Sequence, residues 1–433
     1  MSDKVRPMAD LQANPALGGF LRAASRTKAE RLNPFVWYRE RLQGDPVQWD
    51  ESSHGWDVFG YSEAQAVLKD QARFSSERFR PGEGPSRGQA PSILNLDPPR
   101  HTALRNLVNL AFTPKAVQYW GERIGEIVDE LLAEIERDRL TTEGVIDLVE
   151  KYAYPLPVIV IAEMMGIPSG DRSSFKRWSD VLVEGPSSVE PAVLMELMQR
   201  KQAARKEMET YFGEILQTRV RDSEYNLIGI LRAANIDGQK LTVEEIISFC
   251  ILLLAAGNET TTNLITNAWR CLLQHPETVK AVQADRGLIP GLVEETLRYY
   301  SPVQATSRIA KDDVELFGHP VARGDRVTVW LGAANRDERV FAAPDAFDVR
   351  RTPNHHLAFG HGIHFCLGAP LARMEAQLAI GAILDRYQHF SSTTTELDPI
   401  VSGFVFGVKS LPIRVERNSG SGVTGMEEGN IDG

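Results

Sequence analysis

The stretch Phe359-Gly360-His361-Gly362-Ile363-His364-Phe365-Cys366-Leu367-Gly368 decides how this chain is to be interpreted. It places one cysteine among glycines and aromatic residues, before a helix that we expect to begin near Leu367. A thiolate at a helix N-terminus is stabilised by the helix dipole and by backbone N–H groups. The glycines let the backbone bend closely around something flat and bulky. These features favour a thiolate ligand to haem iron, which supplies electron density and promotes O–O cleavage.

Two alternatives to haem ligation are a buried structural cysteine and a zinc site. His355, His356, His361 and His364 do crowd around Cys366. Zinc sites, however, have recognisable ligand spacing, and structural ones usually use more than one cysteine. The sequence contains no CxxC or HExxH pairing, and zinc explains none of the features found elsewhere in the chain.

A long apolar helix is the second informative feature. Thr242-Val243-Glu244-Glu245 is a capping box that opens it, and nothing stops it before His275-Pro276. A helix of about 33 residues is roughly 50 Å long, so it must cross the whole domain. Its middle, Ala256-Gly257-Asn258-Glu259-Thr260-Thr261-Thr262, combines poor helix formers with a carboxylate that is costly to bury. Such rule-breaking is expected at functional sites, with a polar stripe or a kink as the alternative.

Both stretches resemble motifs of the cytochrome P-450 superfamily, and a third motif strengthens the resemblance. Glu295-Thr296-Leu297-Arg298 follows the long helix and lies about 70 residues before the cysteine, as in that family. An ExxR motif alone is worth little, because i, i+3 pairs are common on helices. In the family the pair is buried and joined to a later arginine, here Arg350 or Arg351. The resemblance implies a structural role for this network in building the haem pocket.

The resemblance covers residues 30–415 and implies a mainly α (α+β) cytochrome P-450 fold. A long central helix and small peripheral β-sheets characterise that fold. We expect a single domain over 30–415, a partly flexible N-terminal segment at 1–29 and a disordered C-terminal tail at 416–433, which is rich in Gly, Ser, Glu and Asp.

Several local elements follow from hydrophobic patterns and turn signals. A helix capped by Ser62 is expected to run through Lys69, and the Gly- and Pro-rich segment 78–94 is expected to be a functional loop. Short strands are expected at 47–49, 56–59, 314–316 and 327–330, with a turn at 318–320 and a last hairpin that joins 405–408 to 413–415.

The resemblance assigns roles to residues of the three motifs. Cys366 would be the iron ligand, and Gly257 would leave room for dioxygen. Thr260 and Glu259 would be the catalytic pair: Thr260 would hydrogen-bond the bound oxygen, and Glu259 would relay protons. His101, Arg105, Arg308 and His356 match positions that hold the haem propionates, which need cationic or hydrogen-bonding partners. The full set of implied haem contacts is His101, Arg105, Ala256, Gly257, Arg308, His356, Phe359, Gly360, His364, Cys366 and Gly368.

Substrate contacts are implied by the same family geometry. They are Ile93, Leu94, Leu252, Ala255, Val303, Ala305, Thr306, Phe404 and Val405. Nearly all are apolar, which predicts a hydrophobic substrate that is bound mainly through burial of its apolar surface. The alternative for each is an ordinary position in the core.

Composition bounds the class of protein. The 433 residues are 42% hydrophobic and 24% charged, which is ordinary for a globular protein. Three cysteines argue against a disulfide scaffold, and a net charge of −10 disfavours nucleic acid as a partner. The longest apolar run, 246–256, is too short to span a bilayer, and the N-terminus lacks a signal pattern. We therefore expect a soluble, cytoplasmic monomer with no membrane or nucleic-acid partner.

The function implied is that of a haem-thiolate monooxygenase using haem b (iron protoporphyrin IX) and O2. It would hydroxylate or epoxidise an apolar small molecule such as a fatty acid, terpenoid or steroid. Electrons would come from NAD(P)H indirectly, through a reductase and a ferredoxin or flavodoxin. These would dock on a basic patch for which Arg100, Lys115 and Arg373 are candidates. The alternatives are a peroxygenase driven by hydrogen peroxide and a non-catalytic haem sensor or carrier.

Overall fold

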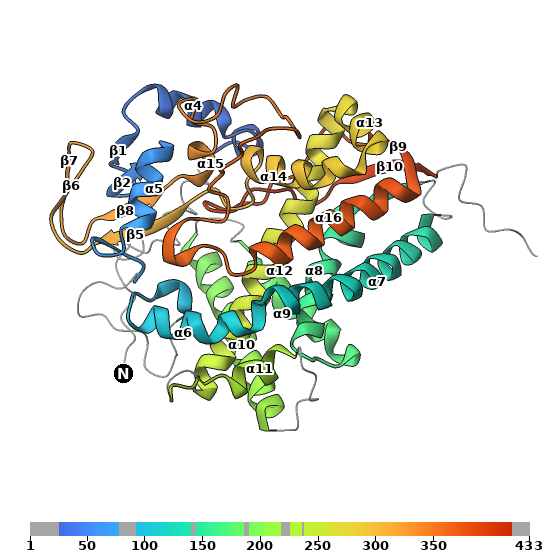
Figure 1. Ribbon diagram of the computed structural model, residues 1–433, viewed down its shortest axis with the longest axis horizontal. Helices are drawn as coiled ribbons and strands as arrows, with labels where there is room; N and C mark the ends of the chain where they lie inside the picture. The colour runs from blue at the N-terminus through green and yellow to red at the C-terminus, as the bar shows by residue number, and fades with distance from the viewer. Residues whose placement is uncertain are drawn as a thin grey trace, which may run out of the picture.

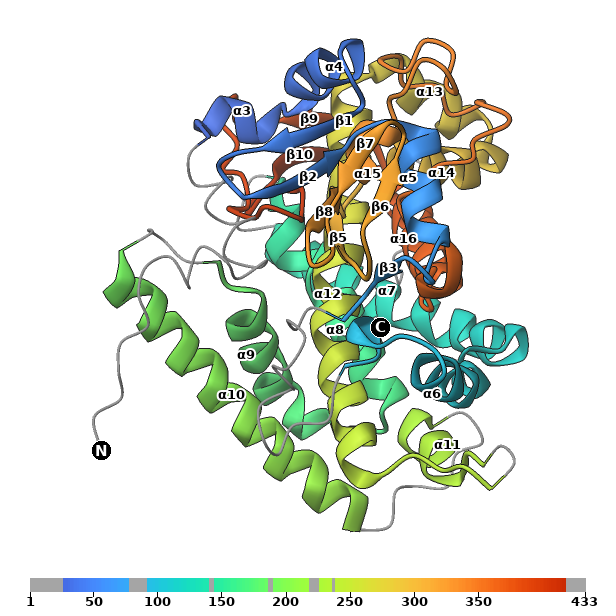
Figure 2. The same cartoon turned by 90° about the vertical axis from the view of Figure 1, so that its left-hand side faces the viewer.

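The central element of the computed structural model is helix α12 (Val243–Gln274), which is 32 residues long. The structure describes residues 26–77, 92–139, 144–185, 190–217, 226–235 and 238–417. The predicted capping box is confirmed: the Thr242 side chain accepts from the Glu245 N–H, and the Glu245 carboxylate accepts from the Thr242 N–H. Figure 2 shows α12 running through the middle of the molecule, with the β-strands towards one end and α9, α10 and α11 towards the other.

Helices pack around α12 along most of its length, and α7 and α16 lie side by side in Figure 1. Prolines at 114, 155, 191 and 276 each begin a helix, because the first turn does not need their missing N–H. The longer helices are α6 (Arg100–Asn109), α7 (Pro114–Arg139), α8 (Pro155–Met164), α9 (Arg172–Val183), α10 (Pro191–Gln217), α14 (Ile289–Tyr299) and α16 (Ala369–Arg386). The shorter ones are α3 (Lys28–Leu32), α4 (Phe35–Gln43), α5 (Tyr61–Lys69), α11 (Leu227–Ala233), α13 (Pro276–Ala284) and α15 (Leu331–Ala334).

Three small sheets lie beside the helices. The largest has the order β1 (Val47–Asp50), β2 (Gly55–Val58), β8 (Arg326–Val329), β5 (Thr306–Ala310) and β3 (Phe74–Ser75). A three-stranded sheet has the order β4 (Val145–Asp147), β10 (Pro412–Arg417) and β9 (Tyr387–Ser392), and β6 (Val314–Leu316) pairs with β7 (His319–Val321). Among the described strands β2 and β8 alone run parallel. The mainly α fold with small peripheral sheets is thus confirmed.

Three local predictions in the C-terminal part of the chain need correction. Residues 405–408 do not form a hairpin with 413–415, because β10 pairs with β9 and β4, and Val405 makes only an isolated bridge to Val303. The turn expected at 318–320 lies instead at Phe317 and Gly318, which both have positive φ, and residues 319 and 320 belong to β7. Strand β10 continues through Arg417, so 416 and 417 do not belong to a tail.

Helix α5 starts two residues earlier than predicted, because Gly60 rather than Ser62 is its N-cap. The reason is tertiary: the N–H of Tyr61 donates to Asp337 Oδ2 at 2.9 Å, a bond that replaces a local side-chain cap. Residues 1–25, 78–91 and 418–433, which include most of the predicted terminal segments and of the predicted loop, lie outside the described residues.

A buried charge network ties α14 to the chain that leads into the cysteine loop. The Glu295 and Arg298 side chains are fully buried, and Arg298 Nη2 lies 2.8 Å from Glu295 Oε1. Arg351, and not the exposed Arg350, completes the pair, with its Nε 3.1 Å from Glu295 Oε2. The backbone N–H of Asp348 donates to the same carboxylate at 2.9 Å. The predicted network is therefore present, and it contains the second of the two candidate arginines.

We expect Glu295→Ala to destabilise the protein strongly, because it leaves Arg298 buried without its carboxylate. Removing one partner of a buried ion pair costs about 3–5 kcal/mol, which urea unfolding would detect. Glu277→Ala is a suitable control, since it removes an exposed carboxylate beside His275 and should cost less than about 1 kcal/mol. Equal losses for the two variants would contradict the structural role of Glu295.

Candidate active site

A cavity of about 340 Å³ lies between the middle of α12 and the loop that carries Cys366. Its walls come from segments far apart in the sequence, including α6, α8, α12, α16 and β5. Cys366 lines this cavity together with Ala256, Gly257 and Thr260, so two of the sequence motifs face one space. The ExxR motif is represented in the wall only by Leu297.

The cysteine loop is shaped by its glycines. Gly360 and Gly362 have φ values of 73° and 72°, a left-handed conformation that favours glycine. A Cβ on Gly362 would also lie 2.6 Å from the carbonyl oxygen of Leu68, which leaves no room for a side chain. The N–H of Cys366 donates to the carbonyl of Phe359 at 2.9 Å and closes the loop. Helix α16 then begins at Ala369, two residues later than predicted.

The environment of the Cys366 thiol differs from the sequence-based expectation. Burial raises the pKa of this thiol, and the backbone N–H groups of Gly368 and Ala369 together with Arg105 offset the increase only in part. The helix start alone therefore does not stabilise the thiolate. A metal cation bound to the sulfur would supply the missing positive charge, because a coordinating thiol loses its proton.

One wall of the cavity is suited to anionic groups. The rings of His101 and His364 lie 4.2 Å apart, and both nitrogens of His101 and the Nε2 of His364 have no hydrogen-bond partner among the described residues. Burial, followed by the charge of Arg105, lowers the pKa of His101, and burial lowers that of His364 to about 3. Arg105 and Arg308 line the same cavity. Two neutral rings and two guanidinium groups fit the propionates that the sequence predicted here.

The remaining haem contacts fit a flat group beside Cys366. Ala256, Gly257, Phe359, Gly360 and Gly368 all line the cavity. A Cβ added to Gly368 would meet no protein atom within 4 Å, so this glycine leaves open space next to the sulfur. The described residues therefore offer a thiol, open faces and a cationic wall around one cavity, which is the donor set that haem requires.

His356 is the exception among the predicted propionate partners. Its Nε2 lies 3.2 Å from Glu294 Oε2, and it does not line the cavity. Arg373 binds the same carboxylate, with its Nε 2.6 Å from Glu294 Oε1. Burial would raise the pKa of Glu294, but hydrogen bonds from His356 and Arg373 lower it to about 2. The structure therefore places His356 in an ion-pair cluster behind the cysteine loop, while His364 takes its place in the cavity.

The motif at the middle of α12 combines close packing with one hydroxyl in the cavity. A Cβ on Gly257 would lie 3.3 Å from Ile161 Cδ1, so the glycine lets α12 approach α8. The Thr260 hydroxyl donates to the carbonyl of Ala256 at 2.7 Å. A hydroxyl has one proton and two acceptor lone pairs. Towards the cavity, Thr260 can therefore accept a hydrogen bond in this arrangement.

Glu259 lies outside the cavity wall, on the neighbouring face of the helix. Successive residues of an α-helix point about 100° apart, which separates Glu259 from Thr260, and no hydrogen bond joins them in the described structure. Burial raises the pKa of Glu259 to about 7, against the opposing charge of Lys201 on α10. Lys201 Nζ also donates to the carbonyl of Leu182, at the end of α9, at 2.8 Å. At neutral pH Glu259 can thus either hold or release a proton.

Asn258 contributes a buried network that the sequence did not reveal. Its Nδ2 donates to Ser179 Oγ on α9 at 2.5 Å, and its Oδ1 accepts from Thr262 at 3.3 Å. Asn258 and Ser179 are both fully buried. The network fixes the rotation of α12 about its own axis, which in turn directs Thr260 towards the cavity and Glu259 towards Lys201.

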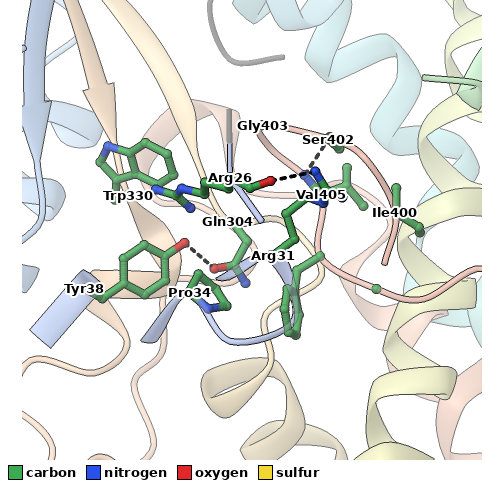
Figure 3. A pocket seen from close by; sticks show the side chains of 12 residues that line it. Arg26, Arg31, Pro34, Tyr38, Gln304, Trp330, Ile400, Ser402, Gly403 and Val405 are labelled. Atoms are coloured by element: carbon green, nitrogen blue, oxygen red, sulfur yellow. Dashed lines mark hydrogen bonds between the residues drawn. The ribbon is translucent and has the colours of Figure 1, made fainter. Parts of the chain in front are cut away.

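Five of the nine predicted substrate contacts line the cavity: Ile93, Leu94, Leu252, Val303 and Thr306. Ala255, Ala305 and Phe404 do not; Ala305 is buried in a separate aromatic cluster with Phe404 packed against it. Val405 lines a different, small cavity beside Tyr38 and Gln304, whose side chains share a 2.6 Å hydrogen bond (Figure 3). These four assignments followed chain proximity to residues that do line the cavity, and chain proximity does not fix where a side chain lies.

The sequence analysis missed many cavity residues, and helix periodicity could have found those on α12. Phe249, Leu253, Thr261 and Leu264 lie on the α12 face that also carries Leu252 and Thr260, at spacings of three and four residues. Ile161 on α8 and Glu375 on α16 carry no comparable signal. Their place in the wall depends on how α8 and α16 pack against α12.

Among the described residues, no helix is both long and apolar enough to cross a membrane, and no three His, Cys, Asp or Glu side chains gather into a metal-binding group.

Comparison with known proteins agrees with this geometry. The cytochrome P-450 family model matches residues 12–417. Cytochrome P-450 109 of Bacillus spizizenii is 43% identical over 391 residues, which are 90% of this chain and 93% of that protein. Substrate-free CYP109E1 from Bacillus megaterium superposes with a TM-score of 0.85 at 46% identity, covering 90% of this chain and 100% of that chain. Its complex with corticosterone gives a TM-score of 0.81 at 45% identity, covering 89% and 99%. The chain therefore belongs to the cytochrome P-450 family of monooxygenases.

Proposed function

We propose that this monooxygenase inserts one oxygen atom from O2 into an apolar small molecule of about the size of a steroid, with terpenoids and fatty acids as further candidates. The observation that carries the proposal is the shared cavity, in which the Cys366 loop and Thr260 face apolar side chains such as Leu252. CYP109E1 has been crystallised with corticosterone, and this supports the steroid size class. Titrating a library of steroids, terpenes and fatty acids while following the haem spin state tests the substrate class.

The haem site is proposed from the residues that fit it. Cys366 would bind the iron, and His101, Arg105, Arg308 and His364 would hold the propionates. Bound haem b would supply the iron centre at which dioxygen is activated. The protein would position the substrate, exclude water and deliver protons.

Proton delivery is assigned to Glu259 and Thr260. Glu259 is partly buried, and its raised pKa of about 7 keeps part of its population protonated near neutral pH. General acids work best when their pKa lies near the operating pH. Thr260 can accept a hydrogen bond in the cavity from a water that receives the proton from Glu259. A peroxygenase would not need this pair, so tests of Glu259 and Thr260 also separate the two functions.

Electron delivery is proposed to come from a separate ferredoxin or flavodoxin, reduced through a reductase by NAD(P)H. Two of the three candidate docking cations have carboxylate partners on their own chain. Arg373 is paired with Glu294, and Arg100 is paired with Glu245 on α12. Because these carboxylates neutralise their charge, we expect the two arginines to contribute less to steering a partner than free surface cations would.

Cys366→Ala should abolish thiolate ligation, because neither of the other cysteines, Cys250 and Cys271, lines the cavity. The measurement is the absorption spectrum of the reduced protein with carbon monoxide, in which the wild type should show a strongly red-shifted band. Cys250→Ala is the matched control and should keep that band. A normal band in Cys366→Ala would remove the basis of the haem assignment.

Thr260→Ala should uncouple reductant use from product formation while leaving substrate binding intact. The variant removes the hydrogen bond acceptor that faces the cavity, and positioned proton-transfer groups typically contribute about 10²- to 10⁴-fold. Reductant consumed, hydrogen peroxide released and product formed should be measured together. Thr266→Ala is a control on the same helix, since its hydroxyl bonds the carbonyl of Thr262 away from the cavity. Unchanged coupling in Thr260→Ala would favour the peroxygenase function.

Coupling in the wild type should fall as the pH rises through about 7, because Glu259 loses the proton that it donates. The sign follows from its pKa, which burial raises to about 7: the acid form predominates below that pH and the carboxylate above it. Glu259→Gln should couple poorly at every pH and lose this dependence. The ratio of product to reductant, measured from about pH 6 to about pH 8, checks the prediction. An identical pH profile in the variant would show that another group donates the proton.

A further inference from the structure

Glu375 is a buried carboxyl group that the proposed reaction does not use. It lies on α16, the helix that follows Cys366, and its side chain lines the same cavity. The residue is only 2% exposed. Leu371 and Ala372 on the same helix, and Thr261 and Leu264 on α12, also line this cavity. A titratable group has thus been placed in largely apolar surroundings within the cavity that would hold the iron.

The carboxyl group has no compensating charge. Its Oε2 makes no hydrogen bond to any side chain or backbone group of the described residues. Burial raises the pKa of Glu375 to about 8. A carboxylate is costly to bury without a partner, and such a group usually stays neutral instead. The neutral acid can donate one hydrogen bond to a buried water, which commonly serves otherwise unpaired polar groups.

Other charged groups near α16 are directed elsewhere. On α14, Glu294 binds Arg373 and Glu295 binds Arg298. On α12, Glu259 faces Lys201. On α7, Arg123 binds Glu163, Asp129 binds Arg386, and Glu136 accepts a hydrogen bond from Tyr387. The titratable groups that line the cavity with Glu375 are His101, Arg105, Arg308, His361, His364 and Cys366. Of these, His101 and His364 have lowered pKa values. Glu375 is the carboxyl group in the described cavity wall.

We propose that Glu375 is a redox-linked proton-binding site: it takes up a proton from solvent when the haem iron in its cavity is reduced, and it releases that proton on oxidation. The inference rests on the haem site proposed above. In the step, one electron from a one-electron donor enters the ferric iron and one proton enters the Glu375 carboxylate. The charge of the cavity is thereby unchanged, and no bond between heavy atoms forms or breaks.

The physical reason is electrostatic. Reduction adds one negative charge to a cavity of low dielectric constant, where charges interact much more strongly than in water. An added negative charge raises the pKa of a neighbouring carboxyl group further. Glu375 would thus have a higher pKa in the reduced protein than in the oxidised protein. At a pH between these two pKa values, uptake of an electron by the iron is coupled to uptake of a proton by Glu375. Rising pH then makes reduction harder.

The test is a spectroelectrochemical titration of the haem-loaded full chain from about pH 7 to about pH 9. The wild-type midpoint potential should become more negative across this range, because the oxidised protein loses the Glu375 proton near pH 8. Glu375→Gln has nearly the same shape but cannot titrate, so it should lose this dependence. Asp385→Asn, which removes an exposed carboxylate from the same helix, should retain it.

Infrared difference spectra provide a second readout that does not depend on turnover. Reduction of the wild type near pH 9 should produce a carboxylic acid C=O band that shifts in D2O and is missing in Glu375→Gln. An unchanged pH dependence of the potential in Glu375→Gln, or the same infrared band in that variant, would overturn the proposal.

If Glu375→Gln fails to bind haem, Glu375→Asp provides the test, because it keeps a titratable acid and should retain both signals with a shifted midpoint pH. Loss of both signals in a folded, haem-loaded Glu375→Asp would count against the proposal. Absence of the thiolate band in the wild type would instead contradict the proposed function.

Discussion

The fully buried carboxylate of Glu295 is the constraint on which the architecture around the cavity depends. A buried charge must be paired, and Glu295 finds its partners in Arg298, Arg351 and the backbone of Asp348. Arg298 in turn donates to the carbonyl of Asn335 at 3.0 Å, and Asn335 Oδ1 accepts from the N–H of Leu357 at 2.6 Å. One ion pair therefore fixes α14, the long chain after α15 and the start of the cysteine loop relative to one another.

Two faces of helix α12 carry side chains with different surroundings. One face lines the cavity with Phe249, Leu253 and Thr260, while the next turns Glu259 towards Lys201. The buried bond from Asn258 to Ser179 fixes that orientation. Since the helix is continuous through this segment, the Glu259 carboxyl group and the Thr260 hydroxyl are held in a fixed relation, although they do not touch directly.

Burial decides the protonation of the groups around the cavity. It raises the pKa of Glu259 to about 7 and that of Glu375 to about 8, and it lowers that of His364 to about 3. All three shifts favour the uncharged form, as expected where water is excluded. The cavity wall is therefore almost free of net charge outside Arg105 and Arg308, and each added electron or proton has a large electrostatic effect within it.

The sequence by itself determined what depends on local spacing. The long capped helix, the cysteine in its glycine-rich loop and the Glu295–Arg298 pair can each be recognised from a short stretch of sequence. This is possible because caps, helix periodicity and turn glycines act over a few residues. Only the tertiary structure decided which distant residues meet. It chose Arg351 over Arg350, placed His356 on Glu294, paired β10 with β9 and β4, and brought Glu375 into the wall. Each of these outcomes depends on how helices and loops pack across the core, and side-chain packing between elements far apart in the chain leaves no periodic signal in either of them.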